Sequence, residues 1–300
     1  MRALITGGRG FVGTWLSAHL SDCGDDVTVI DAETDVADLS VLGPAVAEAA
    51  PHAIYHLAAK SHVGESWTDP AEVLRVNVLG TAALLAAARK VSEVPKVLVV
   101  SSAEVYGFVS PEQLPISEVA PLLPATPYAA SKAAAEQVAL QAWRGYGQPV
   151  VVVRPFNHVG PGQAPTFAVS ALARRIVEAK RNGSRSLRVG SLTPRRDFTD
   201  VRDVVKAYRL LIERGEEGTV YNICSGADVA ISDVAALLLE LSGADLELVP
   251  DPALVRPVDV PVLRGSLRRV GEAVGWRPEI PLSQTLRDVL AYWEEHAGAD

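Results

Sequence analysis

The chain has 300 residues, of which 48% are apolar and 21% are charged, and its formal net charge is -8 at pH 7. This composition indicates a folded globular protein that can bury a sizeable core without disulfides or metals. The acidic balance disfavours nucleic acid and anionic membrane as partners, because both require a basic surface.

The first half alternates apolar strands with helices. Strands are predicted at Ala3–Thr6, Val27–Ile30, Ala53–His56, Val97–Ser101 and Val150–Arg154. Helices are predicted at Phe11–Asp22, Leu39–Ala49, Val73–Lys90 and Tyr128–Tyr146. Apolar strands between helices indicate an α/β fold with a doubly wound parallel sheet of the Rossmann type, which we expect over residues 1–154.

The second half is richer in proline and glycine, and we expect residues 155–300 to form a smaller mixed α/β substrate lobe. Helices are predicted at Phe167–Arg181, Val201–Arg214, Ile231–Ser242 and Leu282–His296, and strands at Leu187–Val189, Val220–Cys224 and Leu246–Val249. A turn is expected before Val201–Arg214. Parts of residues 198–225 are expected to return to the first lobe.

A glycine turn joins the first strand to the first helix. Gly7, Gly10 and Gly13 permit a tight turn, close approach of a pyrophosphate and close packing of helix on strand. Phe11 and Val12 open the helix, whose N–H groups would face the phosphates. The position between strand and helix favours a dinucleotide site over a tight turn that binds no ligand.

Asp31 follows the second strand, where a carboxylate can accept hydrogen bonds from the adenosine ribose and would repel a 2′-phosphate. We therefore expect NAD(H) rather than NADP(H). Asp35 and Val36 are expected to frame the adenine. The alternative for Asp31 is a solvated turn residue.

Tyr128 and Lys132 lie four residues apart at the start of a helix, so they share a face. Tyrosine has a pKa of about 10, and a nearby ammonium together with a cationic nicotinamide would lower it toward neutrality by favouring the phenolate. Ser102 follows an apolar strand at the edge where open sheets place ligands. These three residues predict an acid–base centre. The alternative is a buried tyrosine beside a surface lysine.

Glu104 lies two residues beyond Ser102. A carboxylate there could remove a proton from a carbon next to a ketone. It could equally be a solvated or helix-capping residue, and the two interpretations stay open.

The sequence points to the cytoplasm. No signal peptide precedes the first strand, and no apolar run reaches the roughly 20 residues that span a bilayer. Cys23 and Cys224 lie far apart and lack CxxC spacing, so we expect no metal site.

Longer phrases carry a family resemblance over essentially the whole chain. They are Gly7–Gly13, His56–Val63, Asn77–Thr81, Ser101–Gly107, Tyr128–Lys132, Arg154–Gln163, Arg196–Asp203, Tyr221–Gly226 and Arg256–Pro261. The chain resembles extended short-chain dehydrogenases/reductases that act on nucleotide sugars. Within them it is similar to GDP-mannose 4,6-dehydratases and, most closely, to GDP-4-keto-6-deoxy-D-mannose reductases.

The resemblance implies roles for further residues. Leu57, Ala58, Ala59 and Pro155 would line the cofactor, and Asn77 would brace the central strand. Substrate positions would be Lys60, Ser102, Ala103, Asn157, Arg196, Arg256 and Asp259. The two arginines are apt clamps for a diphosphate, although they could also be ordinary surface arginines. The substrate would be a nucleotide-diphosphate sugar, with GDP favoured.

The resemblance implies NAD(P)H-dependent reduction of the C4 ketone of GDP-4-keto-6-deoxy-D-mannose to GDP-D-rhamnose. Many sugar 4,6-dehydratases carry an aspartate acid at the position of Ala103, which disfavours a dTDP-glucose dehydratase but does not exclude a GDP-mannose dehydratase. A 4,6-dehydratase or 4-epimerase with tightly bound NAD is the alternative, and Asp31 would suit it. A dinucleotide-sensing regulator is a third possibility, which Tyr128 disfavours.

The resemblance also implies a homodimer, in which the helices Val73–Lys90 and Tyr128–Tyr146 would form a four-helix bundle. Tighter burial within one chain would explain the same apolar faces.

Overall fold

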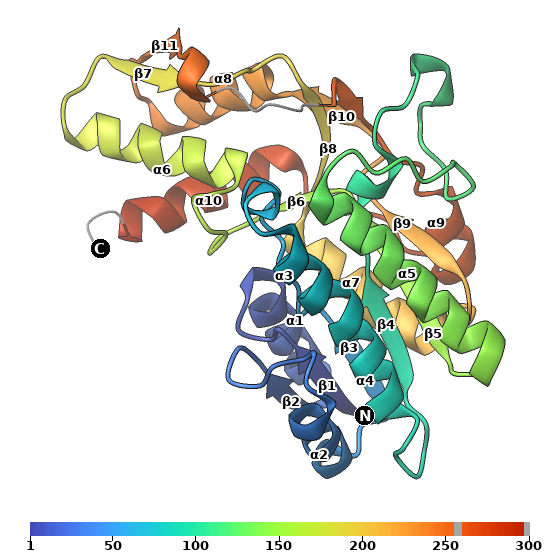
Figure 1. The fold of residues 1–300 in the computed structure, drawn as a ribbon. Coiled ribbons are helices and arrows are strands. Elements are labelled where there is room, and N and C mark those ends of the chain that lie inside the picture. The colour runs from blue at the N-terminus through green and yellow to red at the C-terminus, as the bar shows by residue number, and fades with distance from the viewer. Residues whose placement is uncertain (255–259, 297–300) are drawn as a thin grey trace.

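A six-stranded parallel sheet with the order β2-β1-β3-β4-β5-β9 forms the larger lobe (Figure 1). The computed structural model describes residues 1–254 and 260–296. The strands are β1 (Arg2–Thr6), β2 (Asp26–Ile30), β3 (Ala53–His56), β4 (Lys96–Val100), β5 (Val150–Pro155) and β9 (Val220–Ile223). The α/β class and the parallel Rossmann-type sheet are therefore confirmed.

Helices cover both faces of this sheet. The helices α2 (Leu39–Ala49), α4 (Gly80–Ala88) and α5 (Pro127–Tyr146) pack across one face, and α1 (Phe11–Asp22) and α7 (Val201–Arg214) pair on the other. Successive strand residues point to opposite faces. Leu4 accordingly packs with the first group of helices and Ile5 with the second. Strands buried on both faces explain why they read as continuous apolar runs.

The strand order reverses next to β1. The neighbour on one side is β2 and on the other β3, and both are parallel to β1. In open sheets of this type, ligands bind at the carboxyl ends of the strands beside such a reversal. The ends of β1 and β3, at Thr6 and His56, therefore mark the place where a dinucleotide would bind.

The predicted helix Val73–Lys90 is divided in the structure. It consists of α3 (Pro70–Leu74), a π-helical turn η2 (Arg75–Leu79) and α4. By length and composition the stretch Pro70–Ala88 could cross a membrane, a test that buried helices of soluble proteins also pass. Here it packs against α2 and α5. The wide π turn carries Asn77, and such turns occur frequently at functional sites.

The smaller lobe packs helices on short strands (Figure 1). Its helices are α6 (Ala168–Arg181), α8 (Ile231–Ser242) and α10 (Leu282–His296). Its strands are β6 (Asn157–Val159), β7 (Ser186–Val189), β8 (Arg195–Asp200), β10 (Asp228–Ala230), β11 (Glu247–Pro250) and β12 (Val262–Leu263). In this lobe β8 pairs with β6, β10 and β12. The sequence predicts a turn where β8 lies, and that prediction is wrong.

The segment after β8 contributes to the larger lobe. The helix α7 packs on α1, and β9 extends the sheet beyond β5. The short helix α9 (Arg268–Val274) then packs against β9 and α7. The chain therefore crosses between the lobes more than once, so that the sheet edge and the smaller lobe are built from interleaved segments.

Candidate active site

The glycine turn after β1 brings backbone against backbone. Gly7 has a φ of 71°, in the left-handed region that favours glycine. A Cβ at Gly7 would lie 2.8 Å from the backbone N of Ala58, and a Cβ at Gly13 would lie 2.4 Å from the carbonyl O of Gly7. Both positions therefore require glycine, and helix α1 can begin directly against the strand end.

The amino end of α1 faces the carboxyl edge of the sheet. The helix begins with Phe11 and Val12, and its N-cap residue Gly10 has no side chain to accept the N–H groups of the first turn. These groups and the helix dipole favour an anion. The turn therefore fits the pyrophosphate of the predicted dinucleotide.

Asp31 is fixed beside the glycine turn. Its Oδ2 accepts a hydrogen bond from the backbone N of Arg9 at 2.6 Å, and its Oδ1 accepts from the backbone N of Ala32 at 2.8 Å. Each carboxylate oxygen keeps a further lone pair for a ribose hydroxyl. The Arg9 side chain pairs with Glu33, with Nη1 and Oε2 2.9 Å apart.

The two residues predicted to frame the adenine differ in exposure. Asp35 is exposed and accepts a hydrogen bond from Nη1 of Arg75 at 2.7 Å. Val36 is buried, and a Cβ at Gly80 would lie 2.8 Å from its Cγ2. The Val36 side chain therefore packs on α4, and Asp35 is the residue open to a ligand.

The loop after β3 lies over the glycine turn and is held by Asn77. Leu57, Ala58 and Ala59 are half-buried in this loop. Asn77 accepts from the backbone N of Lys60 at 2.8 Å and donates to its carbonyl O at 3.1 Å. It also donates to Ser131 Oγ on α5 at 2.8 Å. Asn77 thus braces the cofactor loop against the catalytic helix.

The structure brings Ser102, Tyr128 and Lys132 together at the carboxyl end of β4. Thr126 caps α5 by accepting from the backbone N of Ala129 at 3.1 Å, so Tyr128 lies in the first turn. The Tyr128 hydroxyl hydrogen bonds with Ser102. One turn later, Lys132 Nζ donates to the carbonyl O of Val100 at 2.8 Å. The predicted acid–base residues therefore share one buried site.

Burial opposes the lowering of the Tyr128 pKa that is expected from Lys132 and a cationic nicotinamide. Burial raises the pKa of Tyr128 to about 12, and this outweighs the opposing hydrogen bond from Ser102. Burial also lowers the pKa of Lys132 to about 8. Both groups are buried, and removal from water opposes the charged form of each. Tyr128 is a neutral phenol here, which is the form that donates a proton.

Glu104 lies beside this centre rather than in it. Its backbone N donates to Ser102 Oγ at 3.1 Å, so Ser102 is the cap and Glu104 lies in the first turn of η3 (Ala103–Tyr106). Its carboxylate adds to the rise in the Tyr128 pKa. The Glu104 carboxylate is thus close enough to the phenol to influence its charge.

The predicted substrate residues are only partly described. Arg196 Nη1 donates to the carbonyl O of Val260 at 2.6 Å, and Arg256 and Asp259 lie outside the described residues. Lys60 is exposed, and Asn157 is half-buried at the start of β6. Pro155 ends β5 and is buried, and the Ala103 methyl packs in an apolar cluster with Tyr106 and Phe156. The Ala103 side chain thus lies in the core.

A buried polar chain below the site has no counterpart in the sequence predictions. Thr6 Oγ1 lies 2.7 Å from His56 Nδ1, and His56 Nε2 lies 3.0 Å from Thr81 Oγ1. Thr81 donates its one hydroxyl proton to the carbonyl O of Asn77 at 2.7 Å, so His56 Nε2–H must be the donor to Thr81. Polar residues ending the adjacent strands β1 and β3 were the signal.

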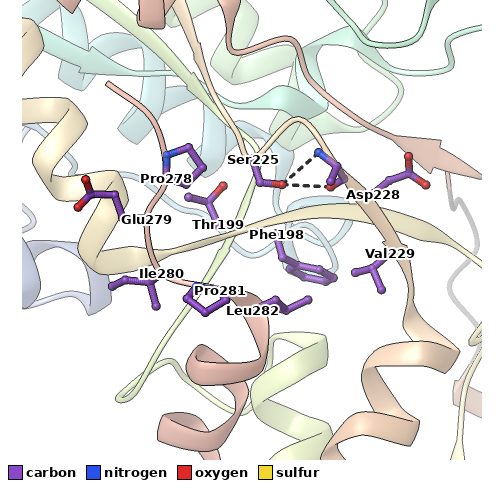
Figure 2. A pocket seen from close by; sticks show the side chains of 11 residues that line it. Phe198, Thr199, Ser225, Asp228, Val229, Pro278, Glu279, Ile280, Pro281 and Leu282 are labelled. Atoms are coloured by element: carbon purple, nitrogen blue, oxygen red, sulfur yellow. Dashed lines mark hydrogen bonds between the residues drawn. The ribbon is translucent and has the colours of Figure 1, made fainter. Parts of the chain in front are cut away.

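A cavity of about 300 Å³ lies in the smaller lobe (Figure 2). Its lining comes from β8, the turn after β9, β10 and the segment before α10: Phe198, Thr199, Ser225, Ala227, Asp228, Val229, Pro278, Glu279, Ile280, Pro281 and Leu282. Among the described residues, none of the predicted acid–base, cofactor or substrate positions lines this cavity. Ser102, Tyr128 and Lys132 lie instead at the carboxyl edge of the large sheet.

Comparison with known proteins decides the family. The model of the GDP-mannose 4,6-dehydratase family matches residues 32–289. The chain belongs to this family.

Members and relatives span the whole chain. GDP-6-deoxy-D-mannose reductase of Pseudomonas aeruginosa is 40% identical over 98% of this chain and 97% of its own length. A dTDP-glucose 4,6-dehydratase of Streptomyces antibioticus is 30% identical over 98% of this chain and 95% of its own length. The solved structure of RMD from Pseudomonas aeruginosa complexed with NADPH has a TM-score of 0.91 at 39% identity, covering 99% of this chain and 100% of that chain.

Other solved relatives bind the same class of cofactor. UDP-glucose 4-epimerase of Thermus thermophilus, solved with NAD, has a TM-score of 0.89 at 29% identity and is matched over the full length of both chains. This member of the GDP-mannose 4,6-dehydratase family is therefore a nicotinamide-dependent enzyme of the extended short-chain dehydrogenase/reductase type. The resemblance stated from the motifs is confirmed.

Proposed function

We propose that the protein reduces the C4 ketone of GDP-4-keto-6-deoxy-D-mannose to give GDP-D-rhamnose. The observation that carries the proposal is the buried, neutral Tyr128 phenol bonded to Ser102. It is supported by 40% identity along nearly the whole chain to a GDP-6-deoxy-D-mannose reductase. Reduction of a ketone needs an acid beside the carbonyl oxygen, and an un-ionised tyrosine supplies it.

A bound nicotinamide supplies the hydride. Tyr128 donates its proton to the C4 oxygen as that oxygen becomes an alkoxide. Ser102 orients the carbonyl through its hydroxyl. Lys132, buried and held by the Val100 carbonyl, stabilises the phenolate that Tyr128 leaves. Gly7–Gly13 and Asp31 would hold the dinucleotide at the pyrophosphate and the adenosine ribose.

The direct test supplies the purified protein with GDP-4-keto-6-deoxy-D-mannose and NADH or NADPH. We expect loss of nicotinamide absorbance in step with formation of one GDP-6-deoxyhexose. Tyr128→Phe should bind cofactor normally and lose about 10²- to 10⁴-fold in rate, the usual contribution of a general acid. If the wild-type protein consumes no reduced cofactor, the proposal is wrong.

Glu104 supports a second candidate, a 4,6-dehydratase or 4-epimerase that oxidises C4 transiently. Its carboxylate influences the charge of the Tyr128 phenol, which supports a role as the base that removes a proton next to C4. In that case Glu104→Gln should abolish turnover of a GDP-hexose while bound NAD shows no net change. Under the reductase proposal, Glu104→Gln should retain most of the reductase activity.

For the cofactor we propose a preference for NAD(H). The Pseudomonas aeruginosa relative was solved with NADPH and the Thermus thermophilus relative with NAD, so the choice rests on this chain's own residues. Asp31 is fixed beside the glycine turn, where we expect the adenosine ribose, and Glu33 pairs with the Arg9 guanidinium. Both carboxylates would repel a 2′-phosphate. Asp31→Asn should raise the NADPH/NADH ratio of kcat/KM by about tenfold, the effect of about 1.4 kcal/mol, and Asp22→Asn should not.

We also propose a homodimer in which α3–α4 and α5 of two chains form a four-helix bundle. Leu74 and Leu79 are 45% and 56% exposed on the first of these helices. Large apolar side chains exposed along one helix favour a surface that another protein covers.

A further inference from the structure

Glu136 extends the line of catalytic residues along α5. Tyr128, Lys132 and Glu136 follow one another at intervals of four residues, so they lie on one stripe of the helix. All three are buried, and Glu136 is fully so. The stripe faces the carboxyl half of the sheet, where Lys132 meets β4. Glu136 is the third contact of this stripe, and the mechanism does not use it.

Arg154 on β5 forms a bidentate ion pair with Glu136. Its Nε donates to Glu136 Oε2 at 2.9 Å, and its Nη2 donates to Oε1. A paired fork of this kind fixes both distance and orientation, because guanidinium and carboxylate must lie in register. Arg154 directly precedes Pro155, the residue expected beside the nicotinamide. The fork therefore sets the rotation of α5 against the end of β5.

The remaining nitrogen of Arg154 reaches the turn that carries Ser102 and Glu104. Its Nη1 donates to the Tyr106 hydroxyl at 2.8 Å, and the guanidinium carbon lies 4.9 Å from the centre of the Tyr106 ring. Tyr106 is the last residue of η3, which Ser102 caps. Arg154 thus touches both the element that bears Tyr128 and the element that bears Ser102.

Tyr106 is itself fixed on its far side. Its hydroxyl donates to Asn222 Oδ1 at 2.7 Å, and Asn222 Nδ2 donates to the carbonyl O of Ile116 at 2.9 Å. The backbone N of Asn222 donates to Glu118 Oε1 at 2.9 Å. The network is buried and its geometry leaves Arg154 a single position.

We propose that Glu136 and Arg154 are positioning residues: their buried ion pair, extended by Tyr106, fixes the Ser102 turn against Tyr128 on α5. The kinetic part of this proposal rests on the proposed reductase function. Stability alone does not account for the pair, because a buried ion pair can commonly be replaced by apolar residues of similar volume without loss of stability. Apolar residues, however, would not set the rotation of α5 or the place of the Tyr106 hydroxyl.

The test compares a charge-free double variant with a matched control. Glu136→Leu combined with Arg154→Met removes both charges and keeps the volume, so it avoids leaving one buried ion unpaired. The control, Asp25→Asn with Arg209→Met, removes the 3.0 Å Arg209–Asp25 ion pair at the amino edge of the sheet, together with the contacts of these residues to Glu213 and the Met1 amino group. We expect both to fold and to bind reduced cofactor with an unchanged Kd.

The proposal expects kcat of the Glu136/Arg154 double variant to fall about 10- to 100-fold, since small displacements of reacting groups have effects of this size. The KM of the double variant and the kcat of the control should each change less than about twofold. Tyr106→Phe, which keeps the ring, should lower kcat in the same direction. A folded double variant with wild-type kcat would overturn the proposal.

A second readout needs no substrate and separates this proposal from the proposed function. In protein isotope-labelled at the tyrosine ring carbon that bears the hydroxyl, the NMR signal of Tyr128 can be assigned with Tyr128→Phe. Its chemical shift should move in the double variant and stay in place in the control, because it reports the hydrogen bond with Ser102. An unmoved signal would contradict the proposal even if the protein reduced no ketone, whereas a moved signal would support it in either case. If the double variant fails to fold, Tyr106→Phe supplies the same readout.

Discussion

Among single residues, Lys132 is expected to control how the reaction rate depends on alkaline pH. Burial lowers its pKa to about 8, whereas the pKa of Tyr128 is raised to about 12. The lysine is charged below pH 8 and loses its charge above it, while the phenol keeps its proton across this range. We expect kcat/KM to fall as the pH rises through about 8. Lys132→Met should have a lower rate with no such decline, and an alkaline decline that persists in this variant would contradict the assignment.

His56 should make the fold sensitive to acid. Burial lowers its pKa to about 3, and the ring is neutral between Thr6 and Thr81. The unfolded chain binds the proton near pH 6.5 and the folded chain does not, so the stability that the neutral ring contributes is present above pH 6.5. It is lost as the pH falls toward 3, by up to about 1.4 kcal/mol per pH unit.

The measurement is thermal unfolding between pH 7 and pH 4. His56→Gln, which has an uncharged donor and acceptor, should be less stable at pH 7 and should lose stability less steeply below pH 6.5. Equal slopes for wild type and variant would show that other groups govern the acid response.

Sequence patterns predicted the acid–base residues because the chemistry restricts residue type and spacing together. The same patterns could not give the Tyr128 pKa, which depends on burial by elements distant in sequence. The polar strand ends Thr6 and His56 were visible in the sequence, but their hydrogen bonds to each other and to Thr81 depend on the packed fold. Asp31 and the glycine turn were predictable because their constraints are local, namely a positive φ at Gly7 and a helix that begins at Phe11.

At the scale of elements, β8 is a strand that could not be predicted from its own residues. It reads Arg-Arg-Asp-Phe-Thr-Asp, and its aspartates Asp197 and Asp200 are buried. Asp197 accepts from the backbone N of Ser225, Gly226 and Gly265, and Asp200 accepts from Arg202 and Thr285. Charged residues can occupy a buried strand when distant segments satisfy them. No local pattern could have revealed these partners.

Asp203 continues this arrangement at the start of α7. It accepts from the backbone N of Glu279 and of Ile280, each at 2.8 Å, and so anchors the segment that leads into α10. Asp203→Ala would leave both N–H groups without this partner, and we expect a loss of about 2 to 4 kcal/mol. Thermal unfolding should show a Tm several degrees lower. Asp245→Ala, at an exposed carboxylate, is the control and should leave the Tm unchanged.

The helix Val73–Lys90 shows the opposite limit of sequence prediction. Its apolar composition gave the element and its approximate ends, but not the π turn at Arg75–Leu79. The turn has an extra residue that lets Asn77 reach both Lys60 and Ser131. A tertiary contact of this kind adds no periodicity to the sequence.

At the scale of the whole molecule, the proposed dimer surface runs along the same helix. Leu79→Asp would place a charge in the middle of the apolar face, and burial of an unpaired carboxylate is strongly unfavourable. We expect sedimentation to show a dimer for the wild type and a monomer for this variant. Leu254→Asp, at a similarly exposed leucine in the smaller lobe, should leave the dimer intact. A wild-type monomer at micromolar concentration would contradict the four-helix interface.

The two lobes meet where the chemistry is predicted. The larger lobe supplies the glycine turn, Asp31 and the Ser102, Tyr128 and Lys132 group, and the smaller lobe begins immediately after Pro155. The chain crosses between them at β5, α7 and β9. A substrate held by the smaller lobe would therefore lie next to the acid–base centre of the larger lobe. This arrangement agrees with a family whose members act on sugars carried by a nucleotide.

The central claim is that hydride ends in the product while Tyr128 supplies the proton. Reduced cofactor carrying deuterium at the transferring position of the nicotinamide should therefore be supplied with GDP-4-keto-6-deoxy-D-mannose, and the product examined by NMR. The account predicts one deuterium at C4 of a GDP-6-deoxyhexose for each cofactor oxidised, and essentially none formed by Tyr128→Phe. Product without deuterium at C4, or conversion without net oxidation of cofactor, would contradict it.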